Sequence, residues 1–130
     1  MAYLIDTNIF IHARDGTLAV QRKFQLYAGA IGISALSLAE LQRGLAAPNA
    51  DTLRRERHRL LLRNLAVFPF DAAAAEAYGA IVSQVGRIKT RDFDHLIAAQ
   101  AIAASVTLVT DNEADFAGIA GLVLENWTRG

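Results

Sequence analysis

Five short apolar runs recur along the chain. They cover residues 2–6, 30–34, 66–70, 106–110 and 121–125. A strand with one wet face alternates polar and apolar residues, whereas nearly continuous apolar runs are typical of strands that are buried on both faces of a parallel sheet. We therefore predict about five short strands in a mostly parallel sheet.

Helix-like stretches lie between these runs. They cover residues 17–28, 34–47, 51–64, 71–85 and 93–105. Asp71 is the predicted N-cap of the fourth helix, and Pro48 is predicted to end the second. Strands that alternate with helices indicate an α/β fold in which helices flank the sheet. A chain of 130 residues has the size of one compact core, so we expect a single domain over residues 1–130.

Composition and charge narrow the class of protein. The chain is 53% hydrophobic and has 13 basic and 13 acidic residues, so its net charge is zero and a nucleic-acid surface must be local. Basic side chains do concentrate in residues 52–65 and 86–94. From these stretches we predict RNA contacts by Arg54, Arg55, Arg59, Arg87, Lys89 and Arg91. The alternative is that the arginines form a solvated helix face.

Several classes of protein are disfavoured by what the sequence lacks. It contains no cysteine, which excludes disulfides, thiolate metal sites and a cysteine nucleophile. No apolar run approaches the ~20 residues that span a bilayer. Met1 is followed by no basic region, and an acid at position 6 interrupts the first apolar run, which argues against export. We therefore expect a cytoplasmic protein without a membrane span.

Asp6 stands at the carboxyl end of the first predicted strand, within YLIDTNIFI (3–11). Ligands of open α/β sheets bind beyond the carboxyl ends of the strands, which is where a metal-binding or reactive group would be placed. The alternative is that Asp6 caps the next helix, with Thr7 and Asn8 shaping the turn.

Other acids are predicted to converge on the same edge of the sheet. Glu40 lies beside the apolar positions of its helix, and Asp94 opens an almost entirely apolar helix, with Asp92 as the predicted N-cap. Each acid alone could be an exposed residue or a cap. Gathered carboxylates repel one another, and hard cations such as Mg²⁺ or Mn²⁺ normally hold them together.

The last acid of the site follows the strand at 106–110. We select Asp115 rather than Asp111, because Asp111 is expected to cap the turn that follows it. If that turn begins a helix, Asp115 lies about one turn further on and points back toward the strand ends. Phe116 is the predicted apolar anchor of this turn.

Five segments carry a family resemblance in order along the chain: YLIDTN, SALSLAEL, DFDHLIAAQA, LVTDNEADF and GIAGLVLENW. Together they resemble the VapC-type toxins of the PIN-domain ribonuclease superfamily over almost the whole chain. The resemblance implies a Mg²⁺- or Mn²⁺-dependent endoribonuclease that cuts transfer or ribosomal RNA by means of a metal-activated water. It also implies a cognate VapB-type antitoxin and assembly into a homodimer or a toxin–antitoxin hetero-oligomer.

Position by position, the resemblance assigns metal binding and catalysis to Asp6, Glu40 and Asp94, and we add Asp115. It places Thr7, Asn8, Ser34 and Thr110 as small polar residues that help to shape the site, with Asp111 beside them. Many relatives have an acid or asparagine two places after the strand-ending threonine, where this chain has Asn112, with Asp111 before it and Asp115 three residues after it, so the pattern leaves the fourth ligand open among these residues. The chain also has the additional acid Asp92.

The resemblance also directs attention to the helices in residues 17–64. They carry Leu26, Leu45, Leu53 and Leu60 beyond what the core requires, so an antitoxin is predicted to dock an apolar face there. Two other functions remain open. An aspartyl-phosphate phosphotransferase usually has a second acid two residues after the first, where this chain has Asn8. A non-catalytic α/β module that binds RNA or protein would use its carboxylates as caps.

Overall fold

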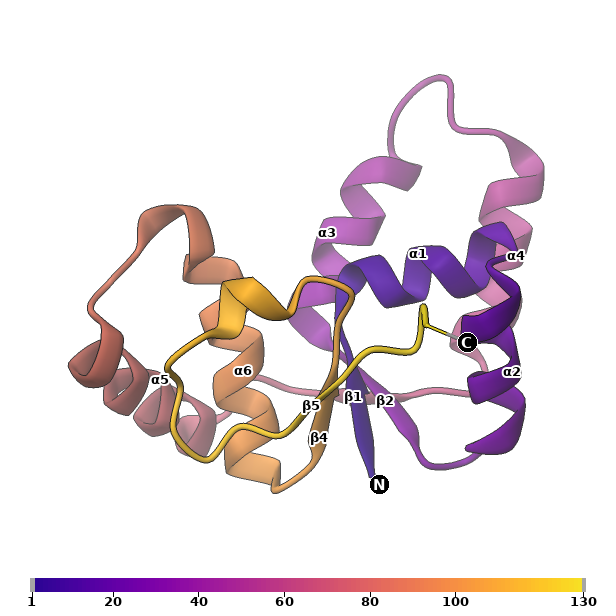
Figure 1. Ribbon diagram of the computed structural model, residues 1–130. Coiled ribbons are helices and arrows are strands. Elements are labelled where there is room, and N and C mark those ends of the chain that lie inside the picture. The colour runs from indigo at the N-terminus through magenta and orange to yellow at the C-terminus, as the bar shows by residue number, and fades with distance from the viewer. Residues whose placement is uncertain (1, 130) are drawn as a thin grey trace.

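A computed structural model describes residues 2–129 and contains one sheet of five strands. The strand order is β3-β2-β1-β4-β5, and all neighbouring strands are parallel (Figure 1). The strands are β1 (Tyr3–Ile5), β2 (Ile31–Ser34), β3 (Ala66–Phe68), β4 (Thr107–Val109) and β5 (Leu124–Glu125). This arrangement confirms the predicted α/β fold with its parallel sheet.

Helices connect the strands in the predicted alternation. They are α1 (Thr7–Asp15), α2 (Leu18–Leu26), α3 (Ala35–Leu45), α4 (Thr52–Leu62), α5 (Ala72–Val85) and α6 (Asp92–Ala104), with 3-10 turns η1 (Lys89–Arg91) and η2 (Glu113–Phe116). The five predicted helices, α2 to α6, are present. Across residues 2–129, no helix combines the length and the apolar character needed to cross a bilayer.

Helix α1 was not predicted as a helix. Asp6 caps it by accepting a hydrogen bond from the Ile9 backbone N–H, and Gly16 ends it in the left-handed region at a φ of 98°. Its apolar residues Ile9 and Phe10 are fully buried. Tertiary burial and two good caps therefore produce a helix where local propensity is weak.

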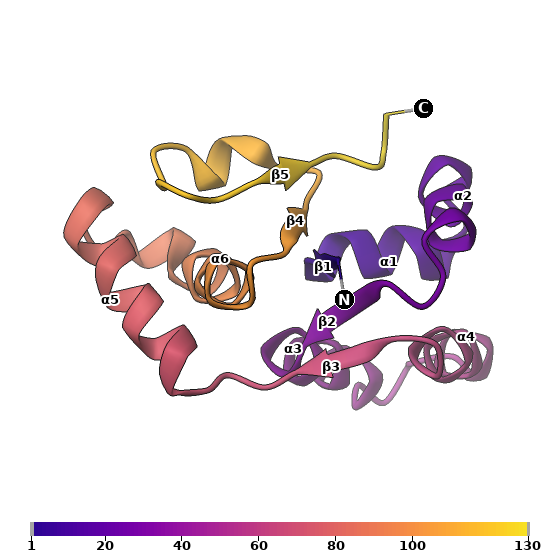
Figure 2. The ribbon, with the colours of Figure 1, turned by 90° about the horizontal axis from the view of Figure 1, so that it is seen from below.

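Helices cover both faces of the sheet, and each face has its own apolar core (Figure 2). Ile5, Ile33 and Val109 point to the face covered by α1, α2 and α4. Leu4 and Leu108 point to the opposite face, which α5 and α6 cover. Because both faces are buried, the strands are apolar along their whole length, as the sequence pattern indicated.

Gly32 in β2 leaves room for the aromatic ring of Phe68, which belongs to the neighbouring edge strand β3. A Cβ added there would lie 2.3 Å from Cε1 of Phe68, a ring that packs into the core beneath α5 and α6. We expect Gly32→Ala to lower the free energy of unfolding by about 1–3 kcal/mol, because the ring must move out of its place. Urea unfolding measures this, and a second substitution, Phe68→Leu, should reduce the loss. Additive losses in the double variant would contradict the proposed clash.

Two of the predicted caps have different outcomes. Asp71 is the N-cap of α5 and accepts a hydrogen bond from the Ala74 N–H at 2.9 Å, as predicted. Asp92 is not the N-cap of α6, because it lies inside the first turn and Arg91 holds the cap position. The Asp92 carboxylate instead accepts hydrogen bonds from the Tyr78 hydroxyl and from Arg87 Nη2, and these contacts lower its pKa.

Candidate active site

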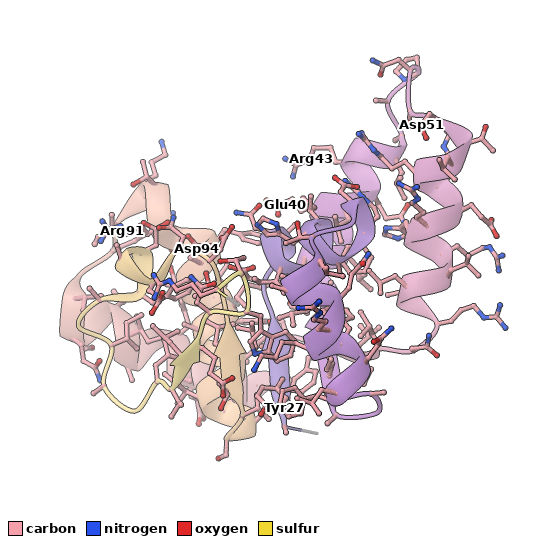
Figure 3. The ribbon with its side chains drawn as sticks, turned by 45° about the vertical axis from the view of Figure 1, so that its right-hand side comes forward. Tyr27, Glu40, Arg43, Asp51, Arg91 and Asp94 are labelled. Carbon is pink, nitrogen blue, oxygen red and sulfur yellow. The ribbon has the colours of Figure 1, made fainter. Side chains whose placement is uncertain are left out.

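A small acidic cleft lies at the carboxyl ends of the strands. Asp6 follows β1, Glu40 comes from α3 and Asp94 from the first turn of α6, and all three line a cleft of about 140 Å³. Thr7, Asn8 and Phe93 complete its polar and apolar walls. Figure 3 shows that Glu40 and Asp94 approach this region from different halves of the molecule. The structure thus brings together three of the four predicted catalytic acids.

Asp6 both caps a helix and faces the cleft, the two roles that the sequence left open. Its side chain caps α1, with Oδ1 3.0 Å from the Ile9 nitrogen, and it also faces the cleft. Burial raises the pKa of Asp6 to about 6, and the charges of Asp111 and Asp94 act in the same direction. Hydrogen bonds from the Thr110 hydroxyl and from Ile9 oppose this shift. The carboxylate is therefore fixed in position and poorly compensated by neighbouring charge.

Asp94 has a similar electrostatic environment. The pKa of Asp94 is raised to about 6, mainly by burial and also by the neighbouring carboxylates of Asp115 and Glu40, while His95 acts in the opposite direction. The largest of the charge effects comes from Asp115, which belongs to η2. Asp115 thus lies close to Asp94, as expected for the fourth acid of the site.

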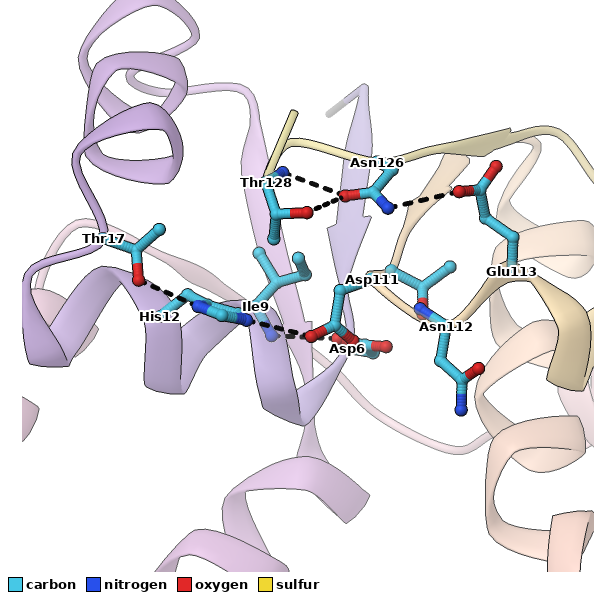
Figure 4. A network of polar contacts seen from close by, with 10 residues as sticks. Asp6, Ile9, His12, Thr17, Asp111, Asn112, Glu113, Asn126 and Thr128 are labelled. Carbon is cyan, nitrogen blue, oxygen red and sulfur yellow. Dashed lines mark hydrogen bonds and ion pairs between the residues drawn. The ribbon is translucent and has the colours of Figure 1, made fainter. Parts of the chain in front are cut away.

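Asp111 and Asp115 have different partners. Asp115 accepts a hydrogen bond from the Asn112 side-chain amide and lies 3.6 Å from Arg91 Nε. Asp111 contacts His12 Nε2 at 2.9 Å, as Figure 4 shows. The prediction that Asp111 caps the following turn is wrong, because Asn112 holds the cap position of η2 without a side-chain hydrogen bond and the Asp111 carboxylate binds His12.

These contacts sharpen the choice between the two acids. Asp115→Asn should reduce RNA cleavage about 10²-fold or more, because it removes a charge beside Asp94. Asp111→Asn should cost less than about tenfold, since Asp111 is bound by His12 and is not among the groups that raise the pKa of Asp94. Cleavage rates across a Mn²⁺ titration measure both effects. A larger defect in Asp111→Asn would reverse the assignment, and equal defects would mean that both acids serve the site.

His12 is a polar residue of this region that sequence reasoning missed. Its Nδ1 contacts Thr17 Oγ1 at 2.9 Å while its Nε2 contacts Asp111, so it links α1 and the N-cap of α2 to the loop after β4 (Figure 4). The two partners His12 and Asp111 are 99 positions apart in the sequence. No local sequence pattern could predict such a contact. It arises because β1 pairs with β4, which brings the start of α1 beside the loop after β4.

The small polar residues divide into two groups. Ser34 is fully buried and caps α3 by accepting from the Leu36 N–H at 3.0 Å, and it does not line the acidic cleft. Thr7 does line the cleft, and its buried Oγ1 has no hydrogen-bond partner among residues 2–129. A buried hydroxyl without a partner is costly, so Thr7 is a site at which a bound ligand or water would be stabilised.

The predicted RNA-binding cations are dispersed. Arg91 lies beside Asp115, and Arg54 lines a second pocket that adjoins the cleft. The others lie elsewhere: Arg55 donates to the Leu45 carbonyl, Arg59 pairs with Glu56, Arg87 pairs with Asp92, and Lys89 is exposed on η1. The structure therefore brings two of the six near the cleft, and the RNA contacts of all six stay predictions.

The ionisation of Asp6 should destabilise the protein in the absence of metal. Its pKa is 3.8 in the unfolded chain and about 6 when folded. Between these values the folded state retains a proton that the unfolded state releases, so stability falls as the pH rises. Asp6→Asn keeps a capping oxygen but cannot ionise, and should raise the free energy of unfolding near neutral pH by about 1–3 kcal/mol.

Urea unfolding of both proteins in EDTA, at about pH 4.5 and about pH 7.5, measures this effect. The stability difference between variant and wild type should be larger at the higher pH. A variant that is less stable than the wild type at about pH 7.5 would show that the hydrogen bonds to Asp6 outweigh its burial.

A parallel sheet with carboxylates gathered at its carboxyl edge is the arrangement of a PIN domain, and the family model described as PIN domain matches residues 3–122. Ribonuclease VapC2 of Rickettsia felis is 34% identical to this chain, covering 99% of it and 100% of that protein. The tRNA(fMet)-specific endonuclease VapC of Shigella flexneri is 30% identical, covering 98% and 99% of the two chains.

A solved structure agrees with these relatives. A chain in the crystal structure of VapBC2 from Rickettsia felis, bound to a DNA fragment from their promoter, superposes with a TM-score of 0.84 at 34% identity. The superposition covers 98% of this chain and 99% of that one. The present chain therefore belongs to the PIN domain family and, within that family, to the VapC-type toxin ribonucleases.

Proposed function

We propose that the chain is a Mg²⁺- or Mn²⁺-dependent endoribonuclease and the toxin of a type II VapBC toxin–antitoxin pair. The observation that carries this proposal is the pair of carboxylates, Asp6 and Asp94, that share one cleft and have pKa values raised to about 6. The names of the two relatives, a ribonuclease and a tRNA(fMet)-specific endonuclease, support RNA cleavage. We place the activity in the cytoplasm, where its RNA substrates are.

The residues of the cleft fit a divalent cation by their chemistry. Asp6, Glu40 and Asp94 in the cleft, Asp115 beside Asp94 and the unpartnered Thr7 hydroxyl offer hard oxygen ligands. A cation would offset the burial and the repulsion between carboxylates that raise the pKa values of Asp6 and Asp94. Within residues 2–129, no three acidic or histidine side chains already form a complete metal site. We propose Asp6, Glu40, Asp94 and Asp115 as the ligands, with side-chain movement bringing them together. When bound, the ion supplies an activated water and stabilises charge on the phosphate.

The protein's own residues would hold this site in a defined orientation. The Ile9 N–H and the Thr110 hydroxyl fix the Asp6 carboxylate, and Asn112 and Arg91 contact Asp115. Arg91 is also available to a phosphate that approaches the acids. Because the chain has no net charge, such local cations and the shape of an unpaired RNA segment would determine which RNA is bound.

The test is cleavage by the purified protein of transfer RNA and ribosomal RNA, supplied separately. We expect fragments of defined length in Mn²⁺ or Mg²⁺ and none in EDTA, with activity restored when Mn²⁺ is added back. A non-catalytic module would bind RNA and leave it intact. Equal cleavage with and without EDTA would reject the metal-dependent mechanism.

A VapB-type antitoxin is the proposed partner, in line with the VapBC complexes among similar structures. An apolar groove of about 260 Å³ lies between α2 and α4, with Phe24, Leu61 and Leu65 in its walls. Leu26, Leu53 and Leu60 of the same helices are exposed by 69%, 58% and 46%. An amphipathic segment that docks there would bury this surface.

Co-purification with a VapB-type partner encoded beside the gene tests the docking surface. Leu26→Asp combined with Leu60→Asp should reduce complex formation, whereas Val123→Asp, at an exposed apolar residue near β5, should not. Sedimentation of the wild type alone would report the proposed self-association. A complex that survives the paired substitutions would place the antitoxin on another surface.

A further inference from the structure

A second pocket opens directly beside the acidic cleft. It has a volume of about 360 Å³ and shares Thr7, Asn8 and Glu40 with the cleft, so the two adjoin at these residues. Its remaining walls combine apolar side chains with two arginines: Ile11, Leu41, Leu45, Arg14 and Arg54. A ligand held at the acids of the cleft would therefore extend into a pocket lined by apolar side chains and arginines.

The cations of this pocket belong to a positively charged region. Asp15 is the acid that neutralises it, and Arg14 binds that carboxylate with Nε at 2.8 Å and Nη2 at 3.2 Å. The pKa of Asp15 is lowered by the hydrogen bond from Arg14 and also by the charges of Arg54 and Arg57. Asp15 thus lies near three guanidinium groups, and Glu40 of the pocket is the second acid of the region, so the region keeps an excess of one positive charge.

The cations also continue away from the acids. Arg14 lines both the second pocket and a larger one of about 450 Å³, where Arg57 follows it. The order of these residues is therefore the carboxylates of the cleft, then Arg54 and Arg14, then Arg57. This order of charges suits an RNA strand. Its cleaved phosphate would lie at the acids, and its following phosphates would be contacted by arginines.

Gly44 gives the pocket its remaining feature. It lies in α3 on the pocket wall, and a Cβ added there would meet no atom within 4 Å. The absent side chain leaves open space over the helix, beside Leu45 and the largely buried Leu41, so the pocket has room for a nucleobase against an apolar wall.

We propose that this pocket binds the ribonucleotide next to the cleaved phosphodiester, with its base against Leu41 and Leu45 and its phosphate contacted by Arg54. The proposal rests on the proposed ribonuclease function and adds to it a subsite for single-stranded RNA. Charge favours RNA over a protein segment as the occupant, because Arg14, Arg54 and Arg57 outnumber the two acids among them, Asp15 and Glu40.

Two substitutions test the subsite, each with a matched control. Gly44→Leu fills the pocket, and Gly79→Leu is its control, since Gly79 also lies in a helix, α5, with nothing within 4 Å of an added Cβ. Arg54→Ala removes the cation, and Arg63→Ala is its control, because Arg63 is an exposed arginine at the end of α4 that lines neither cleft nor pocket. Thermal unfolding of all four variants checks that the fold is kept.

Binding is measured by fluorescence anisotropy with a labelled, mixed-sequence hexaribonucleotide, in the Asp94→Asn background so that the RNA stays intact. Gly44→Leu and Arg54→Ala should each weaken binding about tenfold, and both controls should stay within about twofold of their parent. Arg54→Ala should also lower the slope of log affinity against log salt by about 0.7, as expected for one lost phosphate contact on a single strand.

The outcomes separate this proposal from the one on which it depends. If the wild-type protein cleaves RNA but Gly44→Leu binds the hexanucleotide as well as Gly79→Leu does, the subsite is rejected and the ribonuclease function stands. If Gly44→Leu weakens only the complex with the antitoxin, the pocket belongs to a protein partner and the subsite is again rejected. If the wild type neither binds nor cleaves RNA, both proposals fail.

Discussion

Asp94→Asn should reduce RNA cleavage by roughly 10²–10³-fold at saturating Mn²⁺, with the fold unchanged. Asp94 is the carboxylate whose pKa is raised by both Asp115 and Glu40 and that in turn raises the pKa of Asp6, so it stands at the centre of the four acids. Asparagine has nearly the same size and removes the charge. The measurement is the initial rate of cleavage of purified transfer RNA, with thermal unfolding as the check on the fold.

Asp92→Asn is the matched control for this prediction. Asp92 lies in the same helical turn, but its carboxylate is bound by Tyr78 and Arg87 and does not line the cleft. We expect this variant to cleave RNA within about threefold of the wild-type rate. Near-normal cleavage by Asp94→Asn, or an equal loss in Asp92→Asn, would show that the acids of the cleft are not the catalytic group.

Trp127→Ala should lower the free energy of unfolding by about 3–5 kcal/mol, the cost of truncating a large buried aromatic side chain. Trp127 is 1% exposed, and its ring centroid lies 5.1 Å from that of Tyr3 and 5.7 Å from that of Tyr27. It is the anchor of the segment after β5. Urea unfolding followed by far-UV circular dichroism measures the loss without relying on tryptophan fluorescence.

The segment that Trp127 anchors also contacts the turn that carries Asp115. Asn126 donates from Nδ2 to Glu113 Oε1 at 3.2 Å, and Glu113 begins the turn that carries Asp115 (Figure 4). Trp127→Phe keeps an aromatic ring but loses the hydrogen bond from Nε1 to Glu125, so it should cost about 1–2 kcal/mol and keep activity. A loss below about 1 kcal/mol in Trp127→Ala would mean that the C-terminal segment does not anchor the core.

Most of the fold could be predicted from the sequence because its strands are buried on both faces. Such strands are continuous apolar runs, and turn residues or caps such as Asp71 separate them from the helices. Helix α1 could not be predicted in this way, since Thr7, Asn8 and Asp15 favour turns and caps. The useful signal was the pair of apolar residues Ile9 and Phe10, followed by Gly16 at the position of a helix C-terminus.

The positions of the acids at one edge of the sheet could be predicted from the sequence, but the side chains that each acid contacts could not. Asp6, Asp94 and Asp115 stand at strand ends or helix starts, and in a parallel sheet these meet at one edge. The contact of Asp111 with His12 joins positions 99 apart in the chain, and that of Asp92 with Tyr78 joins two successive helices, α5 and α6. Their geometry depends on packing that no local pattern encodes, so sequence reasoning assigned both acids to caps.

The place of β1 in the sheet has a consequence for synthesis of the protein on the ribosome. Residue 3 of β1 pairs with residue 31 of β2 and with residue 107 of β4, so its second neighbour is translated roughly a hundred residues later. Until then the nascent chain holds Asp6 without the loop that bears Asp115. A product of interrupted translation therefore has no assembled cleft, and the enzyme proposed above would gain its activity against RNA only after its own polypeptide is almost complete.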